Sequence, residues 1–250
     1  MSKGSSTTHF GFRDIPIGDK VSEVRRVFDS VAGNYDLMND LMSMGVHRFW
    51  KWYAVHKLNL HKGDRVLDVA AGTGDLSQLL SDKVGRDGHV CLFDINEPML
   101  VQGRERLINK GLLEGASWVQ GNAEVLPFAD NSFQAVTIGF GIRNVTRIDE
   151  AVKEMVRTLR PGGQFLCLEF SQVVLPLFRS IYDTYSFKVL PEIGHYVAKD
   201  RDAYQYLVES IRRFPNQESY KKLLEDCGLY NVQYFNLSGG IAAIHMGYKV

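Results

Sequence analysis

A turn containing two glycines separates a short apolar run from an amphipathic segment in the first third of the chain. The run Arg65–Val69 predicts a strand, the turn contains Gly72 and Gly74, and a helix is expected to begin at Asp75. Glycine lets the backbone approach a ligand closely, and the N–H groups at a helix N-terminus bind polar or anionic atoms. The turn is therefore a candidate binding loop.

A carboxylate occupies the position expected for a contact with ribose. About 20 residues after the turn, a second predicted strand, Val90–Asp94, ends in Asp94. An acidic residue at the end of this strand can accept hydrogen bonds from both hydroxyl groups of a ribose. The loop and Asp94 together predict a crevice that binds a nucleoside. The alternative is a buried strand–turn–helix that binds no ligand, which would have a similar loop.

The nucleoside is not expected to belong to a dinucleotide. The dinucleotide fingerprint has a third glycine that allows close packing over a diphosphate, but here Gly74 is followed by Asp75–Ser77. An aspartate at the helix start would repel a diphosphate and tolerate a cation. S-adenosylmethionine has a ribose, an amino acid and a cationic sulfonium, and it fits this pattern. Asp68, near the turn, suits the ammonium group of that ligand or the N–H groups of the loop.

Two further strand ends are expected at the same edge. The third strand, Ala116–Gln120, is followed by Asn122 and Ala123, which can offer an amide and a backbone N–H to an adenine edge. Asparagine is also a common turn former, and this alternative applies to Asn122 taken alone. Because ligands of open α/β sheets bind beyond the carboxyl ends of the strands, the three ends together favour binding.

The fourth strand, Phe133–Gly139, leads into a sequence with a second glycine, Gly141, and then Arg143 and Asn144. The glycines permit close approach to the methyl-donating end of the ligand. Arg143 would place a permanent positive charge in or beside the crevice. The alternative is a surface ion pair with an acidic residue of the following helix, Asp149 or Glu150.

The order of these elements predicts an α/β fold with a Rossmann-like, mostly parallel seven-stranded sheet. The fifth strand is Gln164–Phe170, and the runs Asn231–Leu237 and Ile241–Lys249, joined by Ser238–Gly240, predict an antiparallel C-terminal hairpin. Helices are expected over 21–60, 98–110, 147–159 and 217–227. This arrangement resembles the class I methyltransferase fold. We expect residues 1–60 to form an N-terminal arm and helical lid on the core, and 61–250 to form the methyltransferase domain, with a helical insertion at about 172–213.

Composition excludes some other classes of protein. Lysine and arginine number 29, as do aspartate and glutamate, so no basic surplus favours nucleic acid as a partner. The three cysteines are far apart and are expected to be reduced and structural, and no metal site is predicted. The N-terminus is polar, and no run approaches the roughly 20 apolar residues of a membrane span. We expect a cytoplasmic protein with peripheral membrane contact at most.

Two longer segments carry a resemblance to one family. Tyr35–Trp50 and Arg157–Ser171 closely resemble the signatures of the ubiquinone/menaquinone biosynthesis C-methyltransferases. The similarity extends to residues 8–12, 141–145, 185–191 and 209–212, and so covers nearly the whole chain. The Pro161–Gly163 turn occurs in many methyltransferases, whereas the Tyr35–Trp50 segment is highly specific.

The resemblance implies methyl transfer from S-adenosylmethionine to a ring carbon of a polyprenylated quinol. The acceptor would be a methoxy-benzoquinol in ubiquinone synthesis, demethylmenaquinol in menaquinone synthesis, or both. The cofactor-binding positions of that family match four residues of this chain: Thr73, Asp94, Asn122 and Ala123. The family commonly has serine where this chain has Gly139, so only backbone atoms could serve there, and the usual first glycine of the first loop is Ala70.

Losing a proton from one hydroxyl makes the ring carbon of a quinol a better nucleophile. Arg143 would stabilise or help to generate the phenolate, with Asn144 orienting it. Tyr35 could close over the cofactor, Asp36 could accept a proton, and His47 titrates near neutrality. Each of these three residues can also be explained as a packing or capping residue. The aromatic segment Val173–Tyr206 could wall an apolar channel, although an aromatic stripe is also typical of plain core.

Other functions stay open at this point. The fold serves many acceptors, so methylation of another small molecule is one alternative. A second is a scaffold that binds S-adenosylmethionine within a quinone-synthesis complex, and a dehydrogenase is disfavoured by the missing glycine. The sequence does not distinguish a benzoquinol from a naphthoquinol acceptor, identify the general base, or decide whether the protein is a homodimer.

Overall fold

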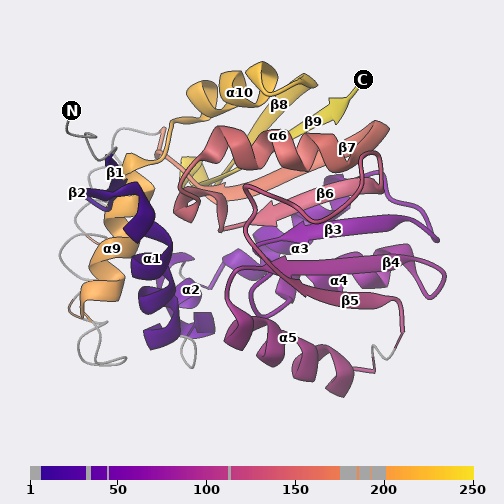
Figure 1. Ribbon diagram of the computed structural model, residues 1–250, viewed down its shortest axis with the longest axis horizontal. Coiled ribbons are helices and arrows are strands. Elements are labelled where there is room, and N and C mark those ends of the chain that lie inside the picture. Colours follow the sequence, from indigo (N-terminus) through magenta and orange to yellow (C-terminus); the bar gives the residue numbers. More distant parts are fainter. Residues whose placement is uncertain are drawn as a thin grey trace, which may run out of the picture.

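A mostly parallel sheet of seven strands forms the centre of the computed structural model (Figure 1), which describes residues 7–31, 35–43, 45–111, 114–174, 185, 192 and 201–250. Five strands are parallel, and β9 is antiparallel to both of its neighbours. The predicted fold class is confirmed. In sheet order the strands are β5 (Ala116–Gln120), β4 (His89–Asp94), β3 (Arg65–Val69), β6 (Phe133–Gly139), β7 (Leu159–Phe170), β9 (Ala242–Lys249) and β8 (Leu229–Leu237).

Side chains that alternate along these strands pack against helices on both faces of the sheet. Val66 and Leu92 belong to one apolar cluster, together with side chains of α3 (His47–Lys57), α4 (Asp75–Val84) and α5 (Glu97–Asn109). Leu67 and Phe93 belong to the other, together with α6 (Ile148–Thr158) and α10 (Gln217–Asp226). Burial on both faces explains why the central strands are nearly continuous apolar runs.

The strand order reverses between β3 and β6. From β3 the chain proceeds outward through β4 to β5, and then returns to the other side of β3 to form β6. In an open α/β sheet such a reversal leaves a crevice beyond the carboxyl ends of the strands, where ligands bind. The loops after β3, β4, β5 and β6 all meet at this edge.

Helices from distant parts of the chain stand across that edge. Figure 1 shows α1 (Ile17–Val31) and α9 (Arg201–Arg213) side by side, facing the carboxyl ends of the parallel strands, with α2 (Tyr35–Ser43) next to them. A hairpin of β1 (Thr7–Phe10) and β2 (Arg13–Pro16) packs against α1 and α9, and Phe10 stacks on Tyr206 of α9 at 4.2 Å between ring centroids. The division of the chain at residue 60 into a lid and a catalytic domain stays a prediction.

Among the described residues, three differences from the predicted elements are the largest. Residues 7–16 form the hairpin, which the sequence analysis described only as an arm, and α1 begins at Ile17. Strand β7 begins at Leu159 and includes the Pro161–Gly163 turn, because Leu159 pairs with Phe133 before a register shift brings Gln164 opposite Ala135. Of the insertion predicted at about 172–213, the structure shows α9, and most of the rest lies outside the described residues.

Candidate functional site

The loop after β3 turns sharply because three of its residues have left-handed backbone conformations. The φ angles are 52° at Ala70, 54° at Gly72 and 80° at Gly74, which caps α4. Glycine adopts this conformation readily, whereas alanine does so at a cost of about 1 kcal/mol or more. A Cβ atom at Gly141 would collide with the methyl group of Ala70, so the loop after β6 passes directly against this turn.

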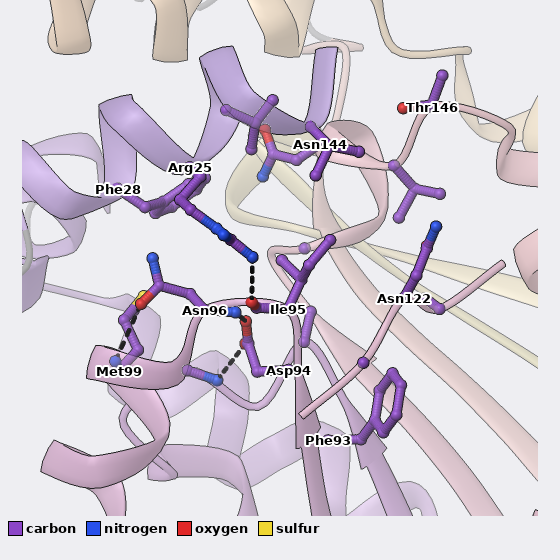
Figure 2. A pocket seen from close by; sticks show the side chains of 18 of the residues that line it. Arg25, Phe28, Phe93, Asp94, Ile95, Asn96, Met99, Asn122, Asn144 and Thr146 are labelled. Atoms are coloured by element: carbon purple, nitrogen blue, oxygen red, sulfur yellow. Dashed lines mark hydrogen bonds between the residues drawn. The ribbon is translucent and has the colours of Figure 1, made fainter. Parts of the chain in front are cut away.

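Asp94 fastens that loop to the end of β4. One carboxylate oxygen accepts a hydrogen bond from the N–H of Gly72 and the other from the N–H of Asn96, both at 2.8 Å. Burial raises the pKa of Asp94, while these N–H groups act to lower it. Each carboxylate oxygen can accept a second hydrogen bond. The carboxylate also lines a hollow, where hydroxyl groups of a ligand can reach it (Figure 2).

This hollow is the first of two at the site. The space between its walls is about 790 Å³, part of which is open to solvent. Strand ends supply Asp94–Asn96, Gly121–Glu124 and Phe140–Gly141, and α1 supplies Arg25 and Phe28 among others. Figure 2 shows Arg25 reaching across the hollow, where it donates to the carbonyl oxygen of Ile95 at 3.1 Å. Helix α1 therefore closes one side.

Asn122 and Ala123 both line the first hollow. The side-chain oxygen of Asn122 accepts from the N–H of Glu124 at 3.0 Å, so Asn122 also forms the turn that was its alternative explanation. Glu124 in turn holds the N-terminus of α6, through hydrogen bonds from the N–H and Nε of Arg147 at 3.1 and 2.7 Å.

A second, smaller hollow adjoins the first and shares Ala70 and Phe140 with it. The space between its walls is about 340 Å³, part of which is open to solvent, and Thr73, Gly139 and Leu76 contribute to its wall. It is strongly polar on one side, where three ionisable side chains gather: Lys51, Asp68 and Asp75. A ligand with a nucleoside in the first hollow can extend a charged group into the second.

Asp68 does not bond the N–H groups of the loop as the sequence analysis allowed. Its carboxylate accepts from the hydroxyl groups of Ser77 on α4, at 2.5 Å, and Thr137 on β6, at 2.8 Å. The reason is the register of the sheet, which places Thr137 beside Asp68 on the neighbouring strand. Burial raises the pKa of Asp68 to about 6, against opposing contributions from these two hydroxyl groups.

Arg143 is buried and paired inside the protein, so the surface ion pair offered as its alternative explanation is wrong. Its Nη1 donates to the carbonyl oxygen of Phe140 and to Glu169 at the end of β7, both at 2.6 Å. Asp149 and Glu150, the predicted surface partners, pair with Lys153 instead. The buried Nε–H of Arg143 has no hydrogen-bond partner. Arg143 itself lines neither hollow, but Gly141 and Asn144, close to it in the chain, line the first one.

Asn144 follows Arg143 and lines the first hollow. Its side-chain oxygen accepts a hydrogen bond from the hydroxyl group of Tyr206 on α9 at 3.0 Å. The 3₁₀ turn Ile142–Asn144 therefore connects the core of the sheet with the helices that cover its edge.

The structure describes only some of the other proposed residues. Tyr35 begins α2, but the side chains of Tyr35 and Asp36 lie outside what the structure describes. His47 is fully buried and its Nε2 lies 2.9 Å from Asp40. Burial and the positive charge of Lys51 lower the pKa of His47, which favours the neutral ring. In the segment proposed as a channel wall, the hydroxyl group of Tyr185 donates to the carbonyl oxygen of Leu41, whereas Phe178, Tyr182, Phe187 and Tyr196 lie outside the described residues.

A model of the ubiE/COQ5 methyltransferase family matches residues 17–249. The chain belongs to this family. It is similar to the ubiquinone/menaquinone biosynthesis C-methyltransferase UbiE of Xanthomonas oryzae pv. oryzae, at 56% identity over 98% of this chain and 97% of the relative. The protein of the same name from Legionella pneumophila is 52% identical over the full length of both chains. The predicted family, S-adenosylmethionine-dependent C-methyltransferase activity and methyl donor are thereby confirmed.

Solved structures show the same fold as this ubiE/COQ5 family member. A SAM-dependent methyltransferase from Thermotoga maritima superposes with a TM-score of 0.65 at 18% identity, covering 91% of this chain and all of the other. One from Aquifex aeolicus gives a TM-score of 0.59 at 17% identity, covering 80% and 89%. Identities this low support the fold alone.

The sequence of this methyltransferase did not predict Lys51, Arg25 or Glu169 as parts of the site. Lys51 comes one helical turn after His47, so the helical period could have placed both on the buried face of α3. Arg25 comes directly after Val24, a residue of the apolar stripe of α1. Glu169 belongs to the family signature, but its partner Arg143 is 26 residues away, and no spacing rule connects them.

The raised pKa of Asp68 predicts how the stability of the enzyme depends on pH. The folded protein holds this proton more tightly than the unfolded chain, in which the pKa is 3.8. The resulting stabilisation is complete below pH 4 and is lost as pH rises through about 6. Relative to Asp68→Asn, the wild type should lose about 2 kcal/mol of unfolding free energy between pH 4 and pH 7. Urea denaturation at several pH values measures both curves, and parallel curves would contradict the assignment.

Proposed function

We propose that this enzyme methylates a ring carbon of a polyprenylated quinol in ubiquinone and menaquinone biosynthesis. The main support is 51–56% identity over nearly full length to proteins named for that reaction. The acceptor would be a polyprenylated methoxy-benzoquinol, demethylmenaquinol, or both. A homodimer and a complex with other quinone-biosynthesis proteins stay predictions.

S-adenosylmethionine would bind across the two hollows. Asp94 would accept hydrogen bonds from the ribose hydroxyls, and Asn122 and Ala123 would lie against the adenine. Gly72 and Thr73 would face the central part of the donor, since Gly72 lines the first hollow and Thr73 the second. When bound, the donor supplies an electrophilic methyl group on a cationic sulfonium. The residue at position 139 has room for a serine, because a Cβ atom there would make only an ordinary contact with Leu76.

Arg143 would stabilise the phenolate of the acceptor. A free phenol has a pKa near 10, so ionising it near neutral pH requires several kcal/mol. The buried Nε–H of Arg143 lacks an acceptor, and a buried donor without a partner is unfavourable by about 1–3 kcal/mol. A phenolate oxygen brought to this N–H would satisfy it. Because Glu169 balances the charge of the guanidinium, a directed hydrogen bond is the main contribution, and proton abstraction by arginine is not required.

Asn144 would hold the same turn against α9 through Tyr206 and so keep Arg143 in place. Tyr35 stays a candidate for closing over the donor. His47 is already bound to Asp40 through one ring nitrogen, and its other ring nitrogen, Nδ1, is buried without a partner. His47 therefore stays a weaker candidate for the base.

We also infer that the enzyme meets its lipid substrate at a bilayer surface through the outer face of α3. Phe49 and Trp52 are 57% and 45% exposed there and stack on each other at 5.7 Å between ring centroids. Lys57 lies 3.8 Å above the ring of Phe235 on β8, beside this pair. Exposed aromatic rings flanked by cations suit the interface of an anionic membrane. No described helix is long and apolar enough to span a membrane.

Direct assay tests the proposed function. Purified enzyme with S-adenosylmethionine and either reduced acceptor, solubilised in detergent, should give a methylated product detected by mass spectrometry. The product is heavier than the acceptor by one CH₂ unit, because the methyl group replaces a ring hydrogen that leaves as a proton. Reduction is needed because the oxidised quinone lacks the hydroxyl that ionises, so the quinone form of each acceptor is the matched control. Binding of the donor without methylation of either quinol would instead favour the scaffold role.

The role of Arg143 can be separated from that of its ion pair. The double variant Arg143→Met/Glu169→Gln removes both charges and leaves no unpaired buried carboxylate, whereas Glu169→Gln alone keeps the arginine. We expect the double variant to lose about 100-fold or more in kcat, as when one donor to a developing oxyanion is removed. Its affinity for the donor, measured by calorimetry, should change little. Equal kcat values for the double and single variants would remove Arg143 from the mechanism.

Vesicle flotation tests the α3 surface. The variant Phe49→Ser/Trp52→Ser should bind vesicles of phosphatidylglycerol and phosphatidylethanolamine about tenfold less than wild type, a loss of about 1.4 kcal/mol. The control Val125→Ser/Tyr230→Ser alters residues that are 69% and 67% exposed elsewhere and should bind normally. If flotation is unchanged and the first variant instead dissociates a dimer in gel filtration, the surface is a subunit interface and the inference fails.

A further inference from the structure

Lys51 is a buried lysine on the inner face of α3, with only 7% of its surface exposed. Its Nζ donates to Asp75 at 2.8 Å and lies 6.0 Å from the ring centroid of Phe140. Buried lysines are rare, because removing an ammonium group from water is unfavourable unless a partner compensates. The position of Lys51 therefore needs an explanation.

Pairing with Asp75 does not explain why Lys51 is buried, because Asp75 has other stabilising neighbours. Its second carboxylate oxygen pairs with Nη1 of Arg106 on α5 at 2.5 Å. It is also the first residue of α4, where the helix dipole favours a negative charge. Although burial acts to raise the pKa of Asp75, the charges of Lys51 and Arg106 keep it below its usual value. Asp75 could share Lys51 with a ligand and remain compensated.

The second hollow is where the amino-acid end of the donor would lie. It adjoins the first hollow at Ala70 and Phe140, so a donor with its ribose on Asp94 extends past these residues. The amino-acid end has both an ammonium and a carboxylate group. Asp68 and Asp75 suit the ammonium group, but they would repel the carboxylate. Among the described residues that line this hollow, Lys51 has the only basic side chain.

We propose that Lys51 binds the carboxylate of S-adenosylmethionine. Asp75 and the donor carboxylate then share one ammonium group, which has three N–H bonds to offer. In this arrangement α3 contacts the amino-acid part of the donor, while the strand ends bind the nucleoside. The inference depends on the donor, which family membership establishes, and is independent of the acceptor.

A pair of ligands that differ only in the carboxylate tests the proposal. S-adenosylmethionine and decarboxylated S-adenosylmethionine are titrated by calorimetry into wild type, Lys51→Met and Arg106→Met. Wild type should bind the complete donor at least tenfold more tightly, as expected for one charged hydrogen bond. Lys51→Met should lose this preference to within about twofold and keep its affinity for the decarboxylated ligand. Arg106 is the other cation beside Asp75, but it does not line the hollow. Arg106→Met should therefore keep the preference.

Other results would overturn the assignment. If Lys51→Met weakens both ligands equally, Lys51 has only a structural role. If it retains the full preference, the carboxylate is held by another group. Equal affinity of the wild type for the two ligands would refute the proposal without any variant, so the test does not depend on the folding of Lys51→Met. Lys51→Arg, which keeps a positive charge, should retain at least part of the preference.

Discussion

The carboxylate of Asp94 connects the ends of two neighbouring strands, and the shape of the donor site depends on this connection. Each of its oxygens is bound by a backbone N–H, one from the loop after β3 and one from the loop after β4. The two loops are therefore held at a fixed separation by the side chain that is proposed to bind the ribose. Folding and ligand recognition use the same atoms here, so a substitution at Asp94 alters the loops as well as the contact.

Most of the sheet could be predicted because each strand is defined by its own local sequence. Strands β5 and β6 have the predicted bounds, since each is a short apolar run between turn-forming residues. The site residues at the strand ends could also be predicted, because parallel strands bring their carboxyl ends to one edge. Asp94, Gly72, Asn122 and Ala123 line one hollow for this reason, even though they are far apart in the sequence.

The parts that could not be predicted depend on contacts between distant residues. The β1–β2 hairpin has strands of only four residues, most of them polar, and it is stabilised in part by a hydrogen bond from the N–H of Phe12 to Glu209, 197 positions away. Arg143 was expected near the crevice, but its orientation follows from Glu169, which the sheet places beside it. Similarly, helical periodicity shows that Lys51 faces inward, but only the packing of α3 against α4 shows that it meets Asp75.

Ala70 and Gly141 limit each other's replacement. The methyl group of Ala70 occupies the space that a side chain at position 141 would need. A larger residue at 141 becomes acceptable only after Ala70 has changed to glycine, which also relieves the left-handed backbone at position 70. The same mutation is thus harmful as a first step and tolerated as a second one. The order in which mutations arise, and not only their identity, restricts the evolutionary paths open to this loop.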